Sequence, residues 1–544
     1  MSNNHAAGAC RQARWKSQHT TELFIAMLLC LALSSMASSC RRQSNVFVIA
    51  LSDNIKTIDP IGSPSVDAAS ERVRSLIFNS LVKKDEKFDY VPELASKIDR
   101  SEDGLTFTFT LRDGVTFHDG RPFTSADAKY TLDTVLASTF AKAASFFEGS
   151  GPSRTAYVKS VEAPDAHTLV VRLNSPWTGL LANLVAIAII PKDSYESQKT
   201  HPLGTGPFKF KSYDQSQQVV DMEANAKYWD GPPQIAALRA RVISDSNALQ
   251  AELQSGRVDI APLPTSLSPD AIKGLGSNAN LTVHQFGGSN LNLLTFNTTE
   301  PPLDNVKVRQ AIAYAINRES MIRDLVLGQG TIAHSILPEE SWAYTPGQTY
   351  HYDPSMAKKL LDEAGFRDPD GDGPQMRFSK PIVFRISGSS GAARQYSGVI
   401  YNYLREVGIP VTIETSELNT LFEFLRRGQF QMTYGQWVGG NQDPIFYRDL
   451  FATSEIPSET RAARNRSRYS NPELDRILEE ATNTYDHAKA APLYARVQEI
   501  VSRDVPVFPL WYQANMAIAK KSVGNIHINA SGDWDFVKDL TVQR

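Results

Sequence analysis

Residues 103–133, DGLTFTFTLRDGVTFHDGRPFTSADAKYTLD, carry the clearest local pattern in this chain. Across residues 105–111 apolar side chains alternate strictly with threonines, which is typical of a β-strand with one buried face. An Asp-Gly turn follows, and residues 115–120 (VTFHDG) predict a second strand and a further turn. Thr124 or Ser125 can then cap a helix. The stretch predicts paired strands that lead into a helix.

Outside this stretch, strands dominate the first half of the chain, and helices alternate with strands in the second half. The strand pattern restarts at residue 291 with LNLLTFN, and Asp304 can cap the helix that follows it. We therefore predict an α/β fold of two lobes, each with its own sheet, divided near residue 290. Further predicted helices begin at Asp353-Pro354 and Asn471-Pro472, where proline suits the first helical position.

Length and composition exclude several classes of protein. The chain has 544 residues, which corresponds to two to four domains at roughly 100–200 residues per domain. Lys and Arg total 56 and Asp and Glu total 59, so the net charge of −3 does not suggest a nucleic-acid partner. The three cysteines are Cys10, Cys30 and Cys40. The rest of the chain therefore has no thiol nucleophile, no disulfide and no cysteine-bound zinc or iron–sulfur cluster.

The N-terminus has the features of an export signal. Basic residues precede the apolar run 23–33, which is shorter than the roughly 20 residues that span a bilayer but suits a signal peptide. Small residues then lead to Cys40. This resembles a lipoprotein signal, in which Cys40 is lipidated after removal of residues 1–39, although Ala37 stands where leucine is usual. The alternative is ordinary cleavage near Ser39, with Cys40 incidental.

We find no pattern for catalysis or metal binding. His118 lies in a predicted turn, and the sequence has no HExxH motif. Asp368, Asp370 and Asp372 resemble the start of a calcium loop, but Ser379 stands where such a loop needs a bidentate glutamate. We interpret this run as a solvated turn. No catalytic residue, resident metal or cofactor is predicted.

Aromatic residues at the end of one predicted strand are a better candidate for a site. Tyr434 and Trp437 end the strand 430–437, and VGGNQDP follows at residues 438–444. Glycines after a strand allow a ligand to approach the backbone closely. The alternative is a tight turn without a ligand.

Several stretches of the mature chain resemble those of a known family and occur in the family's order. It is similar to the extracytoplasmic solute-binding proteins of the peptide/nickel class, family 5, which serve ABC importers. The stretches besides residues 103–133 are TIDP (57–60), LIFNSLVKKD (76–85), YVPELASKI (90–98), GTGPFKFKSY (204–213), ANAKYWDGPP (224–233), NVKVRQAIAYAINR (305–318) and YDPSMAKKLLDEAGF (352–366).

The resemblance implies a two-lobed periplasmic-binding-protein fold of class II, of the large type with an extra N-terminal subdomain. Mixed sheets flanked by helices would form the lobes, with a ligand cleft between them that closes about a hinge. The domains expected on this basis are a signal peptide (1–39), a first lobe (40–290) including the extra subdomain (about 85–200), a second lobe (291–508) and a return to the first lobe (509–544).

In peptide-binding members, the resemblance also implies an acid that holds the peptide amine in a W-x-x-D type turn. Placing Trp437 on that turn puts Gly440 at the position of the acid, and Asp443 matches a different, structural acid. Without a carboxylate there, a free ammonium group loses a charged partner. Blocked peptides, glycosides, metal chelates, or peptides anchored by another acid then become the better expectations.

We therefore expect a non-enzymatic, monomeric lipoprotein that lies outside the cytoplasm, in the periplasm or on the cell surface, anchored to a membrane by Cys40. It would capture a peptide or peptide-like solute and deliver it to the permease of an ABC transporter, with no nucleic-acid partner. The alternatives are a sensor or chaperone-like use of the fold, or a non-peptide solute. The expected ligand-binding residues are Ser63, Ser387, Ser389, Arg394, Tyr434, Trp437, Gly439, Gly440 and Asn441.

Overall fold

The computed structural model describes residues 46–63, 66–148, 154–369, 376–439, 442–458 and 463–543. The predicted signal peptide and Cys40 lie outside these ranges, as do Gly440, Asn441, Asp370 and Asp372. Residues 47–544 form one compact unit by their contacts. Among the helices described, none is long and apolar enough to cross a lipid bilayer.

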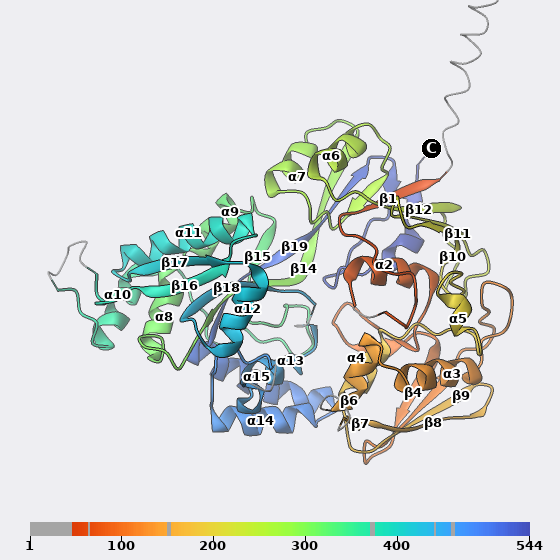
Figure 1. Cartoon of the computed structure of the whole chain (residues 1–544), viewed down its shortest axis with the longest axis horizontal. Coiled ribbons are helices and arrows are strands. Elements are labelled where there is room, and N and C mark those ends of the chain that lie inside the picture. The colour runs from red at the N-terminus through yellow and green to blue at the C-terminus, as the bar shows by residue number, and fades with distance from the viewer. Residues whose placement is uncertain are drawn as a thin grey trace, which may run out of the picture. The chain divides into compact units, whose positions relative to one another are not determined.

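The main element is a mixed sheet in the order β10-β11-β12-β1-β13-β19-β14-β18-β16-β17, with β15 paired to β19 (Figure 1). Its strands are β1 (Phe47–Leu51), β10 (Phe208–Asp214), β11 (Val219–Ala224), β12 (Ala237–Val242), β13 (Ile260–Pro262), β14 (Leu281–Phe296), β15 (Gly330–Ile332), β16 (Ile382–Ser387), β17 (Val411–Ser416), β18 (Met432–Trp437) and β19 (Val507–Lys520).

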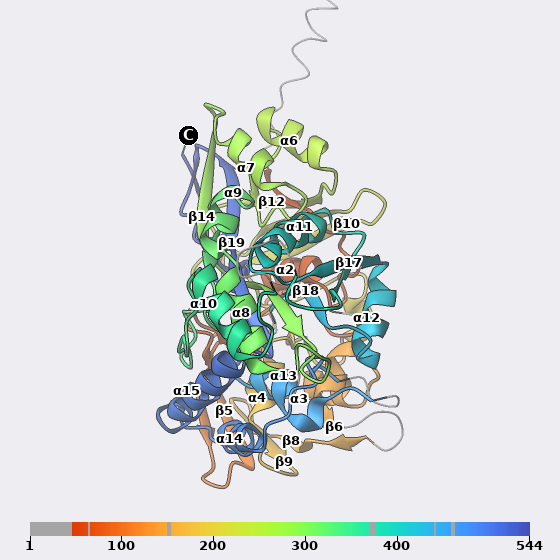
Figure 2. The same ribbon diagram turned by 90° about the vertical axis from the view of Figure 1, so that its left-hand side faces the viewer.

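This single sheet corrects the prediction of a separate sheet for each lobe. Strands β14 and β19 pair antiparallel, from Leu281 opposite Lys520 to Thr295 opposite Val507, and lie side by side in Figure 2. On one flank β19 pairs with β13, and on the other β14 pairs with β18. The prediction failed because strand pairing over more than 200 residues leaves no trace in local periodicity. Strand β14 also begins ten residues before the predicted restart at Leu291.

The stretch 103–133 belongs to a smaller antiparallel sheet, ordered β4-β5-β9-β8. Its β5 (Thr106–Leu111) buries Phe107, Phe109 and Leu111 on one face, as the alternation predicts. The second strand predicted at 115–120 is wrong, since this segment forms only an isolated bridge between Thr116 and Pro122. The other strands of this sheet and of the small hairpins are β4 (Ala95–Arg100), β8 (Val158–Asp165), β9 (Thr168–Leu173), β2 (Val82–Lys84), β3 (Tyr90–Pro92), β6 (Phe147–Glu148), β7 (Thr155–Ala156), β20 (Val523–Gly524) and β21 (Thr541–Val542).

Helix starts follow the capping residues closely. Thr124 and Asp127 form a capping box at α3, and Asp353 accepts a hydrogen bond from the N–H of Met356 at α10. The predicted cap Asp304 is one residue early, because Asn305 caps α8. The helices are α2 (Ala68–Ile77), α3 (Ser125–Leu136), α4 (Gly179–Leu184), α5 (Tyr195–Gln198), α6 (Ser246–Gln254), α7 (Pro269–Leu275), α8 (Val306–Ala315), α9 (Arg318–Asp324), α10 (Pro354–Glu363), α11 (Gly391–Glu406), α12 (Leu418–Arg427), α13 (Phe446–Phe451), α14 (Pro472–Thr482) and α15 (His487–Asp504).

Two large apolar cores lie along the main sheet. One contains side chains from residues 47–260 and 517–540, and the other contains side chains from residues 294–511. Trp511 of β19 is fully buried in the second core, whereas Ala517 and Ala519 of the same strand belong to the first. Strand β19 therefore supplies side chains to both cores. On this basis we propose lobe boundaries near residues 290 and 508.

Candidate functional site

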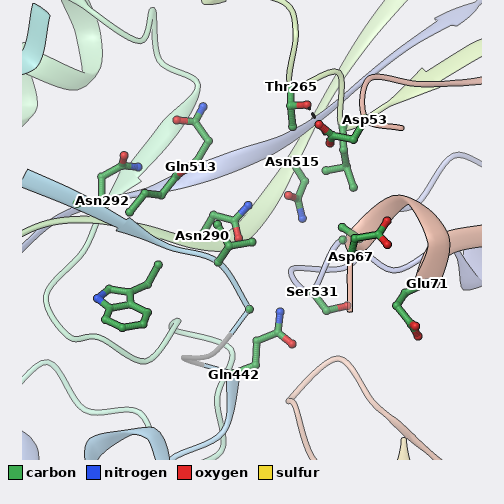
Figure 3. Close-up of a pocket in the computed structure, with 18 of the residues that line it drawn as sticks. Asp53, Asp67, Glu71, Thr265, Asn290, Asn292, Gln442, Gln513, Asn515 and Ser531 are labelled. Carbon is green, nitrogen blue, oxygen red and sulfur yellow. Dashed lines mark hydrogen bonds between the residues drawn. The ribbon is translucent and has the colours of Figure 1, made fainter. Parts of the chain in front are cut away.

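A cavity of about 1260 Å³ lies between the two lobes (Figure 3). It is larger than the roughly 300–1,000 Å³ of ordinary small-molecule pockets. Its walls come from α2 and the loops near Asp53 and Thr265 on one side, and from β18, α11 and α12 on the other. Strands β14 and β19, which join the lobes, contribute the residues between these two walls. A solute held here would contact both lobes and the strands that join them.

Side-chain amides line the part of the cavity formed by β14 and β19. They belong to Asn290, Asn292, Gln513 and Asn515, and Figure 3 shows them grouped near these strands. Internal hydrogen bonds fix three of them: Asn292 Oδ1 accepts from the Tyr434 hydroxyl at 2.6 Å, Gln513 donates to the Gln329 carbonyl at 2.9 Å, and Asn515 donates to the Asn529 carbonyl at 2.9 Å. Each amide so fixed presents a donor or an acceptor in one orientation, which suits recognition of polar groups such as peptide units.

Aromatic side chains from β18 and its surroundings form the next part of the wall. Trp437 packs edge-on against Phe446, with ring centroids 5.0 Å apart, and Tyr434 packs at a steep angle against Tyr396 at 5.7 Å. Burial raises the pKa of Tyr434, so its hydroxyl stays protonated and donates to Asn292. Trp437 is only partly buried and lines the cavity, where it offers a large apolar face to a solute.

Four apolar side chains are exposed inside the cavity. Among the described residues five large hydrophobic side chains are exposed, and all but Val542 line this cavity. They are Val66 at 56% exposure, Leu418 and Phe422 at 42% each, and Val438 at 64%. Exposed apolar side chains that gather in one concave site mark a binding surface rather than ordinary surface variation.

Charged groups gather on the wall formed by the first lobe. Asp53, Asp67 and Asp533 line the cavity together with Arg72. Burial lowers the pKa of Arg72, and the nearby carboxylates of Asp53 and Asp533 oppose that effect. Asp67 caps α2 through Oδ1, whereas its buried Oδ2 has no hydrogen-bond partner within the described part of the chain. This wall can therefore accept a donor from a solute.

Five of the nine expected site residues line the cavity: Ser387, Ser389, Tyr434, Trp437 and Gly439. The Ser387 and Ser389 hydroxyls lie 2.8 Å apart and share a hydrogen bond.

The other four expected site residues are placed differently. Ser63 is buried outside the cavity lining, and its carbonyl accepts from the N–H of Ala141. Arg394 also lies outside the lining and donates to the Gly388 carbonyl. Gly440 and Asn441 fall outside the described residues.

The acid that follows Trp437 in the sequence is not part of the cavity. Asp443 accepts hydrogen bonds from the Tyr90 hydroxyl and from the N–H of Ile445, and it is absent from the lining. This agrees with its interpretation as a structural acid. Its neighbour Gln442 does line the cavity and is held by Lys84 at 2.9 Å and by Ser289 at 2.9 Å.

Sequence reasoning missed the side-chain amides, the apolar residues of α12, and two arginines that line the cavity, Arg464 and Arg466. The spacing of Leu418 and Phe422 matches an amphipathic helix, and only their exposure separates them from core residues. For the arginines the segment RNRSR offers no local signal beyond charge. The amides are likewise scattered along two strands and become neighbours only through pairing.

Among the described residues that line the cavity there is no histidine and no cysteine. Across the described ranges, no three His, Cys, Asp or Glu residues come together as ligands of a metal ion could. His118 is tied to the Gly206 carbonyl at 3.0 Å, and burial lowers its pKa to about 4, as expected for a neutral structural histidine.

A solute-sized cavity between two α/β lobes that share hinge-like strands defines the class of two-lobed solute-binding proteins. Residues 89–458 match the family model of the bacterial extracellular solute-binding proteins, family 5, and the chain belongs to this family. Members of this family act outside the cytoplasm.

Curated relatives and solved structures agree with this assignment. The dipeptide-binding protein of Escherichia coli is 28% identical over 484 residues, covering 85% of this chain and 88% of the relative. Heme-binding protein A of Haemophilus influenzae is 29% identical, with 84% of each chain covered. The structure of HbpA2 from Haemophilus parasuis matches with a TM-score of 0.77 at 25% identity, covering 92% of this chain and all of that one. NikA from Brucella suis, solved with Fe(III)-EDTA, has a TM-score of 0.78 at 22% identity, covering 91% and 99%, and supports the fold.

Proposed function

We propose that this protein captures a short peptide or peptide-like solute in the cavity and delivers it to the permease of an ABC transporter, without catalysing a reaction. The observation that carries the proposal is the set of oriented side-chain amides on β14 and β19, next to the aromatic side chains of β18. Amides of this kind can hydrogen-bond peptide units, while Trp437 and its apolar neighbours accept side chains. The dipeptide-binding relative is consistent with this solute class.

Native mass spectrometry of freshly purified mature protein tests the proposal, because two-lobed proteins can retain a solute between their lobes. The expected result is an added mass that fragments into amino-acid residues. Calorimetry with an equimolar mixture of tripeptides then measures affinity. A retained non-peptide compound, together with no heat from peptides of two to five residues, would contradict the peptide proposal.

A solute without a free ammonium group is the second candidate. Asp443 is tied to Tyr90 and lies outside the cavity lining, so it cannot supply the acid that holds an amine after Trp437. An ammonium group would instead have to reach an acid on the wall of the first lobe, where the lining includes Asp53, Asp67, Glu71 and Asp533. Tighter binding of N-acetylated tripeptides than of the free-amine forms would favour this candidate, and the reverse order would favour peptides anchored by those acids.

We propose further that the mature chain begins at lipidated Cys40, is held at a membrane surface by that lipid, and works as a monomer. The apolar run and the small residues before Cys40 support the cleavage and the lipid anchor. In cells, the wild-type protein should partition with membranes and gain mass by acylation, whereas Cys40→Ser should not. Intact-mass analysis of a mature chain that starts at another residue would refute the lipid anchor and leave solute capture unaffected.

A further inference from the structure

Arg466 occupies a distinct position on the cavity wall. Its guanidinium carbon lies 4.8 Å from the ring centroid of Phe422 and 5.9 Å from that of Trp437. Both distances fall within the range of cation–π contacts, and both aromatic residues also line the cavity. Aromatic faces therefore hold this guanidinium at the wall without using its hydrogen-bond donors.

Two arginines line this side of the cavity, and they differ in their partners. Of the described residues between 291 and 508, the charged ones that line the cavity are Arg464 and Arg466. Arg464 pairs with Asp449 at 2.7 Å, whereas Arg466 forms no ion pair with any residue that the structure describes. Burial, and then the positive charge of Arg464, lower the pKa of Arg466.

Apolar side chains accompany Arg466 on this wall of the cavity. Phe422 and Leu418 on α12 and Val438 after β18 are the exposed apolar side chains of this wall. A group that binds Arg466 would therefore have apolar contacts beside its charge. Arginine binds a carboxylate through two parallel hydrogen bonds, and such a pair is stronger where water is excluded.

We propose that Arg466 anchors a carboxylate of the solute and that Phe422, Leu418 and Val438 receive an apolar group next to it. The solute class is thus a carboxylate beside an apolar group, such as the C-terminal residue of a peptide that ends in phenylalanine. This rests on the proposed capture of a solute in the cavity, but it does not require the solute to be a peptide. It places the anchor at Arg466, which was not among the residues expected from the sequence.

The test compares two probes that differ in one charge. Calorimetric titrations use an equimolar mixture of tripeptides ending in phenylalanine, first as free acids and then as C-terminal amides. The wild-type protein should bind the free acids at least tenfold more tightly. Arg466→Gln should lose at least tenfold in affinity for the acids and change by less than about twofold for the amides. Equal binding of acids and amides by the wild type would overturn the role of Arg466 while leaving peptide capture in place.

Two variants separate charge from structure. Arg427→Gln is the matched control, since Arg427 ends α12 on the same lobe, pairs with Glu423 at 2.6 Å and lies outside the cavity lining, and it should keep the preference for acids within about twofold. Arg466→Lys should retain part of the preference, because it keeps the charge but not the paired donors. Loss of discrimination in Arg427→Gln equal to that in Arg466→Gln would overturn the assignment. Thermal unfolding confirms that each variant is folded.

A second pair of probes tests Arg466 if the solute is not a peptide. If neither tripeptide mixture binds, 3-phenylpropionate and 3-phenylpropionamide are titrated at millimolar concentration, followed by Trp fluorescence. A preference for the carboxylate that Arg466→Gln removes would support the anchor for a non-peptide solute. No preference for the carboxylate would overturn it.

Discussion

Tyr90 donates a hydrogen bond to the side chain of Asp443, and this bond connects β3 of the first lobe with the turn that follows β18 in the second. A second contact lies beside it, where Lys84 of β2 donates to Gln442 at 2.9 Å. Burial, and then the charge and hydrogen bond of Asp443, raise the pKa of Tyr90, so the hydroxyl remains a donor. These bonds join the lobes directly and favour the arrangement in which the cavity is enclosed.

Tyr90→Phe should therefore weaken solute binding. A hydrogen bond to a charged group contributes about 1.5–3 kcal/mol. If it is made only when the lobes are together, its loss lowers affinity roughly tenfold or more, chiefly through faster dissociation. Stopped-flow dissociation of the retained solute measures this. Tyr401→Phe is the control, because the Tyr401 hydroxyl forms no hydrogen bond within the described part of the chain. Equal dissociation rates in both variants would contradict a closing role for Tyr90.

Trp437→Ala should reduce solute affinity at least tenfold without unfolding the protein. Trp437 is only partly buried, lines the cavity and packs against Phe446 and the Arg466 guanidinium, so its loss removes apolar contact area from the solute. Calorimetry gives the affinity and circular dichroism the fold. The matched control is Trp342→Ala, which removes a Trp stacked on His487 at 3.7 Å outside the cavity lining. Unchanged affinity in Trp437→Ala would remove Trp437 from the site.

The buried amine of Lys142 should make Glu71 important for stability. Lys142 has a side-chain exposure of 2% and pairs with Glu71 at 2.8 Å and with the Pro60 carbonyl at 2.9 Å. Glu71→Gln leaves a buried charge without its partner, which costs about 3 kcal/mol of unfolding free energy near pH 7. Denaturant unfolding measures the loss. Glu196→Gln, which breaks an exposed pair with Lys199, should cost less than about 1 kcal/mol.

The contribution of Lys142 to the unfolding free energy should change with pH in a definite direction. Burial lowers the pKa of Lys142 from 10.5 to about 8, so between these values the folded protein has released a proton that the unfolded chain still holds. Unfolding free energy from this site therefore rises with pH across that window. Lys142→Met should abolish this rise. A rise of the same size in Lys142→Met as in the wild type would refute the assignment.

Glu93 should produce the opposite slope at lower pH. Burial and then the charge of Asp535 raise the pKa of Glu93 to about 7, although Ser80 and Asn79 donate hydrogen bonds to it. Between about pH 4.5 and 7 the folded protein holds a proton that the unfolded chain has lost, so its unfolding free energy falls as pH rises. Glu93→Gln should flatten this slope, whereas the exposed control Glu102→Gln should not. A wild-type slope retained in Glu93→Gln would contradict the prediction.

Local structure could be predicted from the sequence where a residue acts on its immediate neighbours. Asp353-Pro354 and Asn471-Pro472 begin helices as expected, and the alternation of 105–111 defines β5 and its buried face. Tyr434 and Trp437 were expected in the site because aromatic residues at a strand end followed by glycines form a local pattern, and both line the cavity.

The rest of the site depends on chain pairing at a distance. The amides of Asn292 and Asn515 come together only because β14 pairs with β19, and the sheet that joins the lobes has the same origin. Arg466 differs from Arg464 only in its partners, since Asp449 neutralises one and aromatic rings hold the other. No spacing rule contains that information, because it arises from tertiary contacts.

The position of β19 has a consequence for how the protein is made. This strand is the last strand of the main sheet to be synthesised, yet it lies inside the sheet between β13 and β14. Until residue 520 is available, those two strands have open edges and neither core is complete. The nascent chain therefore cannot complete its main sheet before this strand has been synthesised. A protein that must cross a membrane before it folds gains from such a late-arriving strand, since a chain already closed into lobes would not pass through a narrow translocation channel.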